Sequence, residues 1–169
     1  MRGRSRTCVR SVVRSTMFKS SGKGLVLSLL MGSSPALAYC WDEVASRYDL
    51  EPELLQAIAA VESGYRPQTI NNANRNGTRD IGLMQINSIH LPRLQKQGIT
   101  EERLLSEPCL SVEVAASILT EFIQRFGYNW TAVGSYNVGG GAGPKRDALR
   151  MQYAQKIWAR YEELVANRP

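Results

Sequence analysis

Most of the chain beyond residue 40 carries apolar residues at the spacing of an amphipathic helix. The longest such pattern begins at Ser111 and ends at Gly127. A shorter helix is predicted over about 130–137, and a last helix runs from near Asp147 to the C-terminus with the same repeat. The apolar positions of the longest pattern are Ala115, Ile118, Leu119, Phe122, Ile123 and Phe126.

Two more helices are predicted nearer the N-terminus. Residues 42–48 form a short candidate, and a second helix extends from Pro52 to about Glu62. Asp49 is expected to cap this second helix, and Pro52 fits its first turn, where a missing N–H leaves no hydrogen bond unmade. Gly64 is expected to end it.

The middle of the chain is polar. Residues 65–81 predict a long surface loop with a little strand, and a short segment over 82–87 follows. The chain shows no internal repeat and no low-complexity tract, and 169 residues suit one domain better than two. The fold class that follows is mainly α: one small helical domain with a cleft, and not a symmetric bundle.

The first 38 residues have the composition of a targeting segment. Seven basic residues and no acid lie within 1–23, an apolar run follows over 25–31, and residues 36–38 offer a small-x-small cleavage site. We therefore expect residues 1–38 to be a cleaved signal peptide and 39–169 to be a periplasmic domain. A short buried helix in an N-terminal extension is the alternative, and Met1 and Met17 are both candidate start residues. The run is far shorter than the ~20 residues that span a membrane, so no permanent membrane anchor is expected.

Removing this leader changes the charge balance. The whole chain carries 21 Lys and Arg against 15 Asp and Glu, a formal charge of +6. Seven of the 21 basic residues lie in the leader, which leaves 14 against 15, or −1, for residues 39–169. The high isoelectric point therefore belongs to the leader, and we expect no nucleic-acid partner.

Cysteine usage agrees with export. Cys8 lies in the leader, so Cys40 and Cys109 remain as an even pair, which predicts one disulfide in an exported domain. Two free buried thiols are the alternative, and the bulky Tyr39 disfavours lipidation of Cys40. With one histidine, His90, and no close cysteine pair, the sequence gives no pattern for a metal site, and we expect no cofactor.

Glu62 is the candidate catalytic residue. It shares a helix face with Leu55, Ile58 and Ala59, so it extends an apolar stripe where a charge is costly. It also lies at the helix C-terminus, whose negative dipole disfavours a carboxylate. Both effects raise the pKa of a glutamate, and a carboxyl that stays protonated near neutral pH can serve as a general acid. The alternative is a solvated Glu62, or one paired with Arg66.

Three motifs, in order along the chain, resemble those of one enzyme family. Ala60-Val61-Glu62-Ser63-Gly64 resembles the glutamate-serine motif of the soluble-type lytic transglycosylases, whose fold is related to that of goose-type lysozyme. The segment 82–87 resembles the family's glycine-x-methionine-glutamine motif, and 135–139 resembles its tyrosine-asparagine-x-glycine motif. The resemblance covers nearly all of residues 40–160 and implies a lysozyme-like domain with a substrate cleft.

The resemblance also implies a role for each matching residue. Glu62 is implied to be the catalytic acid and base, while Gln85 and Tyr136 hold the sugar and Ser63 helps to position the glutamate. Met84 is expected in the cleft or its wall. Ordinary packing is the alternative for Tyr136 and Met84. The implied substrate-binding residues are Ser63, Met84, Gln85, Tyr136 and Asn137.

The implied reaction uses one carboxylate and cleaves peptidoglycan glycan strands. Glu62 protonates the oxygen between N-acetylmuramic acid and N-acetylglucosamine and then takes the proton of the muramic C6 hydroxyl, which gives a 1,6-anhydro product. Two alternatives stay open: a lysozyme-like muramidase that uses water, and a non-catalytic peptidoglycan-binding assembly factor. Asp80 bears on the first, because a second carboxylate near the cleft would suit a hydrolase. We expect Asp80 instead to bond loop amides beside Arg79.

The small size of the domain bears on its setting. A lone domain without cell-wall anchoring repeats resembles the accessory muralytic proteins of type III and type IV secretion, conjugation and pilus machines. This resemblance implies local opening of the cell wall, with a secretion-apparatus protein as a partner.

Overall fold

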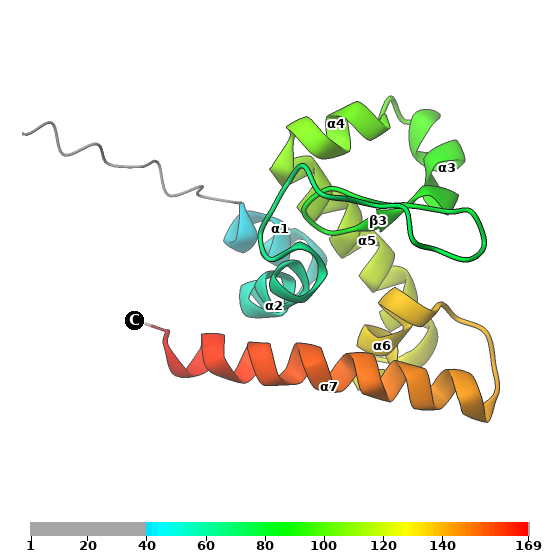
Figure 1. The fold of residues 1–169 in the computed structure, drawn as a ribbon. Helices are drawn as coiled ribbons and strands as arrows, with labels where there is room; N and C mark the ends of the chain where they lie inside the picture. The colour runs from blue at the N-terminus through cyan, green and yellow to red at the C-terminus, as the bar shows by residue number, and fades with distance from the viewer. Residues whose placement is uncertain (1–39, 169) are drawn as a thin grey trace, which may run out of the picture. The chain divides into compact units, whose positions relative to one another are not determined.

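The computed structural model describes residues 40–168, so the expected signal peptide lies outside the described residues. Figure 1 shows that this part of the chain is mostly helical, which confirms the predicted class. None of its helices is long and apolar enough to cross a membrane. The elements are α1 (Trp41–Tyr48), α2 (Pro52–Ser63), the 3-10 turn η1 (Ser88–His90), α3 (Leu91–Gln95), α4 (Glu101–Ser106), α5 (Pro108–Phe126), α6 (Trp130–Val138) and α7 (Pro144–Ala166).

Prolines mark the starts of the three longest helices. Pro52, Pro108 and Pro144 each occupy the first turn of α2, α5 and α7. Pro is favoured there because its φ is already helical and its missing N–H has no partner inside the helix. The predicted starts at Ser111 and Asp147 were therefore three residues late.

The predicted cap at Asp49 is wrong. Asp49 has φ 53° and ψ 48°, so it ends α1 in the left-handed region, which Asp adopts more readily than most residues. Glu51 occupies the cap position of α2, without a side-chain hydrogen bond to the helix. The other end of α2 agrees with the prediction, because Gly64 takes φ 60° directly after Ser63.

The helices between residues 88 and 106 were not predicted. Each is six residues or shorter, so none shows a repeating apolar stripe. Only Leu91, Leu94 and Leu104 of these elements are buried. Single buried leucines carry no periodicity, and a sequence pattern therefore cannot distinguish such turns from loop.

A small antiparallel sheet forms in the polar middle of the chain. Its strands β1 (Ile70–Asn71), β2 (Asp80–Ile81) and β3 (Ile86–Asn87) lie in that order, which confirms the predicted trace of strand. The register pairs Asp80 with Asn71 on one side and Asn87 on the other. The sheet thereby surrounds one carboxylate with two side-chain amides.

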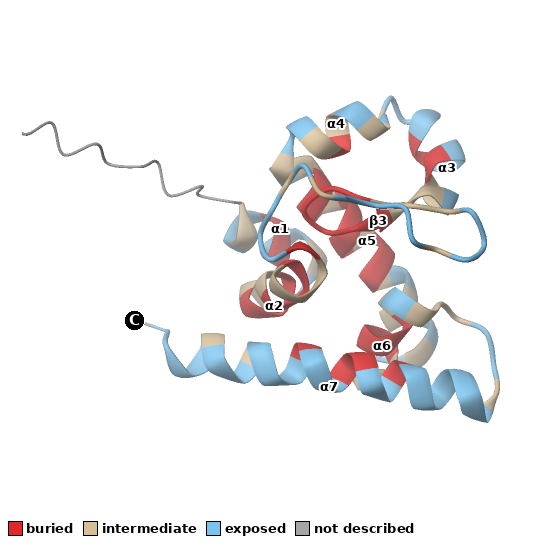
Figure 2. Ribbon diagram, viewed as in Figure 1, coloured by how far each residue is buried: buried red, intermediate tan, exposed pale blue. Residues whose placement is uncertain are grey.

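The core lies between α5 and the helices and sheet around it. Figure 2 shows buried residues on the inward sides of α1, α2, α5 and α6, while most of α7 is exposed. The chain reaches its tightest helix contact at Gly134, where a Cβ would lie 2.5 Å from the carbonyl oxygen of Arg150 on α7. Large side chains that are fully buried include Leu55, Ile58, Leu83, Met84, Leu119 and Ile157.

Cys40 and Cys109 form a disulfide, as predicted. Their Cα atoms are 5.7 Å apart, and the bond joins the residue before α1 to the first turn of α5. Within residues 40–168, no three His, Cys, Asp or Glu side chains are grouped so as to hold a metal ion.

Candidate active site

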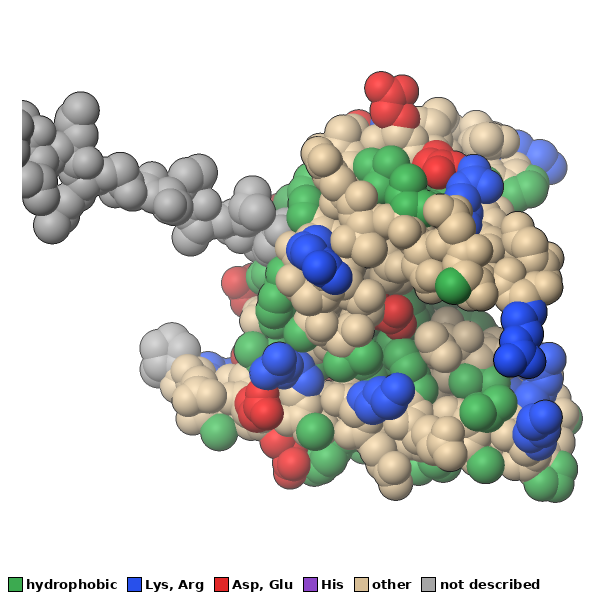
Figure 3. Space-filling view, viewed as in Figure 1, with side chains coloured by type: hydrophobic (Ala, Val, Ile, Leu, Met, Phe, Trp, Pro, Cys, Tyr) green, Lys and Arg blue, Asp and Glu red, His purple; other side chains and the backbone are tan. Residues whose placement is uncertain are grey.

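Glu62 lies in the last turn of α2 and lines an open cavity of about 580 Å³. Figure 3 shows this face hollowed between α7 and the part of the chain that carries the sheet and α3. The cavity brings Glu62 together with three of the predicted substrate residues, Gln85, Tyr136 and Asn137. A second hollow, about 490 Å³, adjoins it and shares Glu62 and Asn137. Glu62 therefore lies where the two hollows adjoin.

Burial controls the protonation of Glu62. It raises the pKa of this carboxyl from 4.5 to about 7, and the negative charge of Asp80 also raises it. Hydrogen bonds from Tyr153 and Asn137, and the charge of Lys156, act in the opposite direction but are weaker in sum. A carboxyl with a pKa near 7 can both give and take a proton at neutral pH, as an acid–base catalyst must.

The surroundings of Glu62 agree with the predicted apolar stripe. Leu55, Ile58 and Ala59 are fully buried beneath it on α2. Arg66 does not form the alternative ion pair, because its Nε donates instead to the backbone oxygen of Ser63 at 2.8 Å. The carboxyl is therefore held on a largely apolar helix face, with no arginine to keep it ionised.

The three sequence motifs meet through hydrogen bonds to one short segment. Ser63 Oγ donates to the backbone oxygen of Leu83 at 2.7 Å. The Tyr136 hydroxyl donates to the next backbone oxygen, that of Met84, at 2.9 Å. The first and third motifs thus hold the second motif from opposite sides, and they fix its position relative to Glu62.

Two predicted substrate residues do not reach the cavity. Ser63 is 2% exposed and Met84 is fully buried, and neither side chain lines the hollow. Both lie in the layer beneath it, where Ser63 ties α2 to segment 82–87 and Met84 packs in the core. The structure therefore favours the packing interpretation for Met84, and Ser63 lies where it helps to hold segment 82–87 in position.

Gln85 supports the loop and lines the cavity at once. Its φ is +48°, and its Nε2 donates to the backbone oxygens of Gly82 and Thr69 at 2.8 and 3.0 Å. Gly82 must be a glycine, because its φ is +76° and a Cβ would lie 2.6 Å from the backbone oxygen of Leu104. The amide nitrogen of Gln85 therefore already donates to the backbone. Its side-chain oxygen remains to accept a hydrogen bond from a substrate.

Tyr153 was missed by the sequence analysis. Its hydroxyl donates to Oε1 of Glu62 at 2.6 Å from α7, 91 residues away along the chain. Burial and the nearby Glu62 raise the pKa of Tyr153 and of Tyr136 well above 10, so both phenols remain neutral donors. The available signal was the position of Tyr153 four residues before Ile157, on the buried face of α7.

Asp80 lines the same cavity as Glu62 and is surrounded by amides. It accepts hydrogen bonds from the side chains of Asn71, Asn74 and Asn87 at 3.2, 2.9 and 2.7 Å. The predicted partners were loop amides beside Arg79, whereas the observed partners are side-chain amides and Arg79 pairs with Glu101. Asp80 is therefore held by neutral donors, and within residues 40–168 it forms no ion pair.

Removing the charge of Asp80 should shift the pH dependence of cleavage. The role of general acid predicted for Glu62 requires a protonated carboxyl, so we expect activity to fall as the pH rises through about 7. Asp80→Asn removes a negative charge that raises this pKa, and the alkaline fall should therefore move to lower pH. Initial rates of sacculus cleavage, measured at a series of pH values from about 5 to about 9, show the size of the shift.

A matched control for that experiment is Glu101→Gln. Glu101 is also a carboxylate near the sheet, but it pairs with Arg79 and does not line the cavity. Its removal should leave the alkaline limb where it is in the wild type. If Asp80→Asn melts like the wild type and its activity falls at the same alkaline pH as that of the wild type, Asp80 does not act on Glu62.

These features define a class of enzyme. A helical domain whose open polar cleft holds a buried, protonatable glutamic acid has what acid-catalysed glycan cleavage of the lysozyme-like type requires. The fold is similar to that of a solved inactive mutant of the lytic transglycosylase Slt from Pseudomonas aeruginosa, with a TM-score of 0.56 and 19% identity. That match covers 76% of this chain and 24% of the Slt chain.

The family is shown by sequence. A family model described as the transglycosylase SLT domain matches residues 39–161, and the chain belongs to this family. It is a peptidoglycan lytic transglycosylase. Similar proteins include the invasion protein IagB of Salmonella typhimurium, 46% identical over 83% of this chain and 86% of IagB. Protein IpgF of Shigella flexneri is 46% identical over 76% of this chain and 83% of its own length.

Proposed function

We propose that the enzyme cleaves the β-1,4 bond between N-acetylmuramic acid and N-acetylglucosamine and leaves a 1,6-anhydromuramoyl end. The observation that carries this proposal is Glu62, a buried carboxyl whose pKa is raised to about 7 and which lies where two hollows adjoin. Such a group can protonate a leaving oxygen and then, once ionised, accept a proton from another hydroxyl.

The reaction divides into two steps that use Glu62 in turn. In the first, the carboxyl protonates the glycosidic oxygen as the bond to muramic C1 breaks, and the substrate's own acetamido group stabilises the positive charge. In the second, ionised Glu62 takes the proton of the muramic C6 hydroxyl, whose oxygen closes on C1. Atoms and charges balance without water and without a cofactor.

The neighbours of Glu62 suit this alternation. Tyr153 donates at 2.6 Å and stabilises the ionised form made in the first step. Asn137 also lowers the pKa by hydrogen bonding, while burial and Asp80 raise it and so help Glu62 to keep the proton that it takes from the C6 hydroxyl in the second step. Gln85 and Tyr136 hold the cavity wall and offer the substrate a carbonyl oxygen and an aromatic edge.

The mass of the products tests the proposal. We expect wild-type protein acting on purified sacculi to release muropeptides with 1,6-anhydro ends, which are lighter than reducing ends by one water molecule. Chromatography with mass spectrometry separates the two product types. Release of reducing-end muropeptides alone would contradict the proposal.

A muramidase is the second candidate, and Asp80 is the observation that favours it. The carboxylates of Glu62 and Asp80 line one cavity, and a pair of carboxylates is the usual equipment for hydrolysis with water. The same product analysis decides between the two, because a muramidase leaves a reducing sugar.

We also propose where the enzyme acts. Residues 1–38 would direct it to the periplasm and be removed, leaving residues 39–169 as the catalytic domain. There it would open the cell wall locally for a secretion or pilus apparatus, with a protein of that apparatus as partner. The similarity to a relative named an invasion protein, and the small size of the domain, support this setting.

A further inference from the structure

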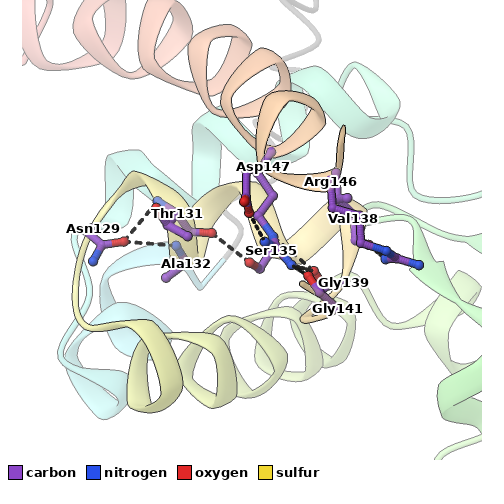
Figure 4. A network of polar contacts seen from close by, with 10 residues as sticks. Asn129, Thr131, Ala132, Ser135, Val138, Gly139, Gly141, Arg146 and Asp147 are labelled. Atoms are coloured by element: carbon purple, nitrogen blue, oxygen red, sulfur yellow. Dashed lines mark hydrogen bonds and ion pairs between the residues drawn. The ribbon is translucent and has the colours of Figure 1, made fainter. Parts of the chain in front are cut away.

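One end of the cleft carries a cation whose charge no described residue balances. Arg146, near the start of α7, is the only Lys or Arg among the described residues that line the cavity of Glu62. Its Nη1 donates to the backbone oxygen of Val138 at 2.9 Å, and Figure 4 shows the side chain extending past Val138 from α7. Within residues 40–168, Arg146 takes part in no ion pair.

Glycines keep the guanidinium group against the cleft wall. A Cβ at Gly141 would lie 3.0 Å from Nε of Arg146, so the absence of a side chain there allows the arginine to lie close to the loop. Arg125, at the end of α5, packs in the same way against Gly140, and it also has no ion pair in the described part of the chain. Two guanidinium groups that form no ion pair with the described residues therefore lie beside a loop whose Gly139 and Gly140 line the cavity, although Arg125 also lies over the ring of Phe126.

The neighbouring Arg150 shows what a structural arginine looks like here. It is 2% exposed, it pairs with Asp147 at 2.6 Å, and it donates to the backbone oxygens of Gly139 and Gly141. Arg150 thus holds the glycine loop with its charge balanced. Arg146 is exposed and has only one hydrogen bond to the loop, so most of its donors are available to a ligand.

The substrate has anions only on its muramic side chain. The sugar rings are neutral, whereas the stem peptide on the lactyl group carries carboxylates, and the lactyl group is itself a carboxylate where no peptide is attached. A guanidinium fork binds a carboxylate through two parallel hydrogen bonds. Building on the function proposed above, we propose that Arg146 binds a carboxylate of the muramic side chain, with Arg125 adding to the positive field at that end of the cleft.

Three forms of the substrate test this assignment. The first has free stem carboxylates, the second has them converted to methylamides by carbodiimide coupling, and the third has lost its peptides to an amidase and exposes lactyl carboxylates. Arg146→Ala should lower kcat/KM on the first form roughly tenfold, the size expected for a charge-assisted pair, and less than about twofold on the amidated form. An equal loss on the amidase-treated form assigns the lactyl carboxylate, and no loss there assigns the stem peptide.

Two variants control for charge and for folding. Lys145→Ala removes the same charge one position away, outside the cavity lining, and should change kcat/KM on free-carboxylate strands by less than about twofold. Arg146→Lys keeps the charge without the fork and should recover part of the loss. Equal losses for Arg146→Ala on native and amidated strands would mean that the arginine only supports the loop, and no loss on any strand would mean that it has no role; either result overturns the proposal.

A binding measurement separates this inference from the proposed reaction. In a Glu62→Gln background, Arg146→Ala should weaken binding of fluorescent free-carboxylate strands by a similar factor, whatever the product of cleavage is. Reducing-end products from the wild type would contradict the proposed reaction and leave the carboxylate site standing. Unchanged strand affinity in the double variant would contradict the carboxylate site alone.

Discussion

Glu62→Gln should reduce cleavage of sacculi by roughly 10⁴-fold, the upper end of what one general acid–base group contributes, because here one group serves both steps. Glutamine keeps the size of the side chain and can still accept the hydrogen bond from Tyr153. It cannot give or take the proton. Release of soluble muropeptides by the purified variant, compared with wild type at equal concentration, measures the loss.

The same substitution should change how stability depends on pH. The pKa of Glu62 is raised from 4.5 to about 7 in the folded protein, so the proton favours the folded state. That contribution is fully present below pH 4.5 and is lost as the pH rises through about 7. Glutamine stays neutral at every pH, so the variant should lose this pH dependence and be more stable than wild type above neutral pH, where wild type must hold a buried charge. Urea unfolding at acid and alkaline pH checks the sign.

Two outcomes would contradict this role for Glu62. Full activity in Glu62→Gln would exclude it from the mechanism, and an inactive wild type would favour the non-catalytic, peptidoglycan-binding alternative. The matched control is Glu43→Gln on α1, which removes an exposed carboxyl far from the cavity lining. It should keep wild-type activity, so that a general effect of lost negative charge is distinguished from a loss of catalysis.

The helices that carry the site could be predicted because their signals are local. The apolar stripe of α5 and the glycine after α2 are readable from neighbouring residues. Asp49 misled the prediction because Asp suits both a helix N-cap and a left-handed C-cap, and only the path of the chain between α1 and α2 decides which. The short helices α3 and α4 depend on single leucines that contact the core, which is a tertiary effect.

The candidate site was predictable in part for the same reason. Glu62 could be found because its unusual environment is set by its own helix. Tyr153 could not be found that way, because its hydrogen bond to Glu62 joins residues 91 positions apart. Motif matching also grouped residues that line the cavity with residues that lie beneath it. Gln85 and Asn137 line the cavity, whereas Met84 and Ser63 do not, and only the folded structure shows this difference.

The disulfide should supply much of the stability of the domain. Cys40 and Cys109 are separated by 69 positions, and in the chain-entropy model closing a loop of that length stabilises the folded state by about 4 kcal/mol. We therefore expect the double variant Cys40→Ala, Cys109→Ala to melt roughly 10–20 °C below the oxidised wild type. Calorimetry of the exported domain measures this difference in melting temperature. The intact mass of the exported domain tests whether the chain begins at Tyr39. It also tests whether the oxidised domain is lighter than the reduced domain by two hydrogen atoms.

Stability and catalysis should respond differently to this change. The disulfide attaches the residue before α1 to the first turn of α5. The cavity is lined by Ile118 and Phe122, which lie farther along α5. The helix α2, which carries Glu62, is anchored in the core by its own buried residues. The double variant should therefore keep wild-type cleavage at temperatures where it is folded, and reduced wild type should melt like the variant. Equal melting of oxidised and reduced wild type would show that the bond does not restrict the unfolded chain. Lost activity in a folded variant would show instead that α1 and α5 must be joined for the cleft to keep its shape.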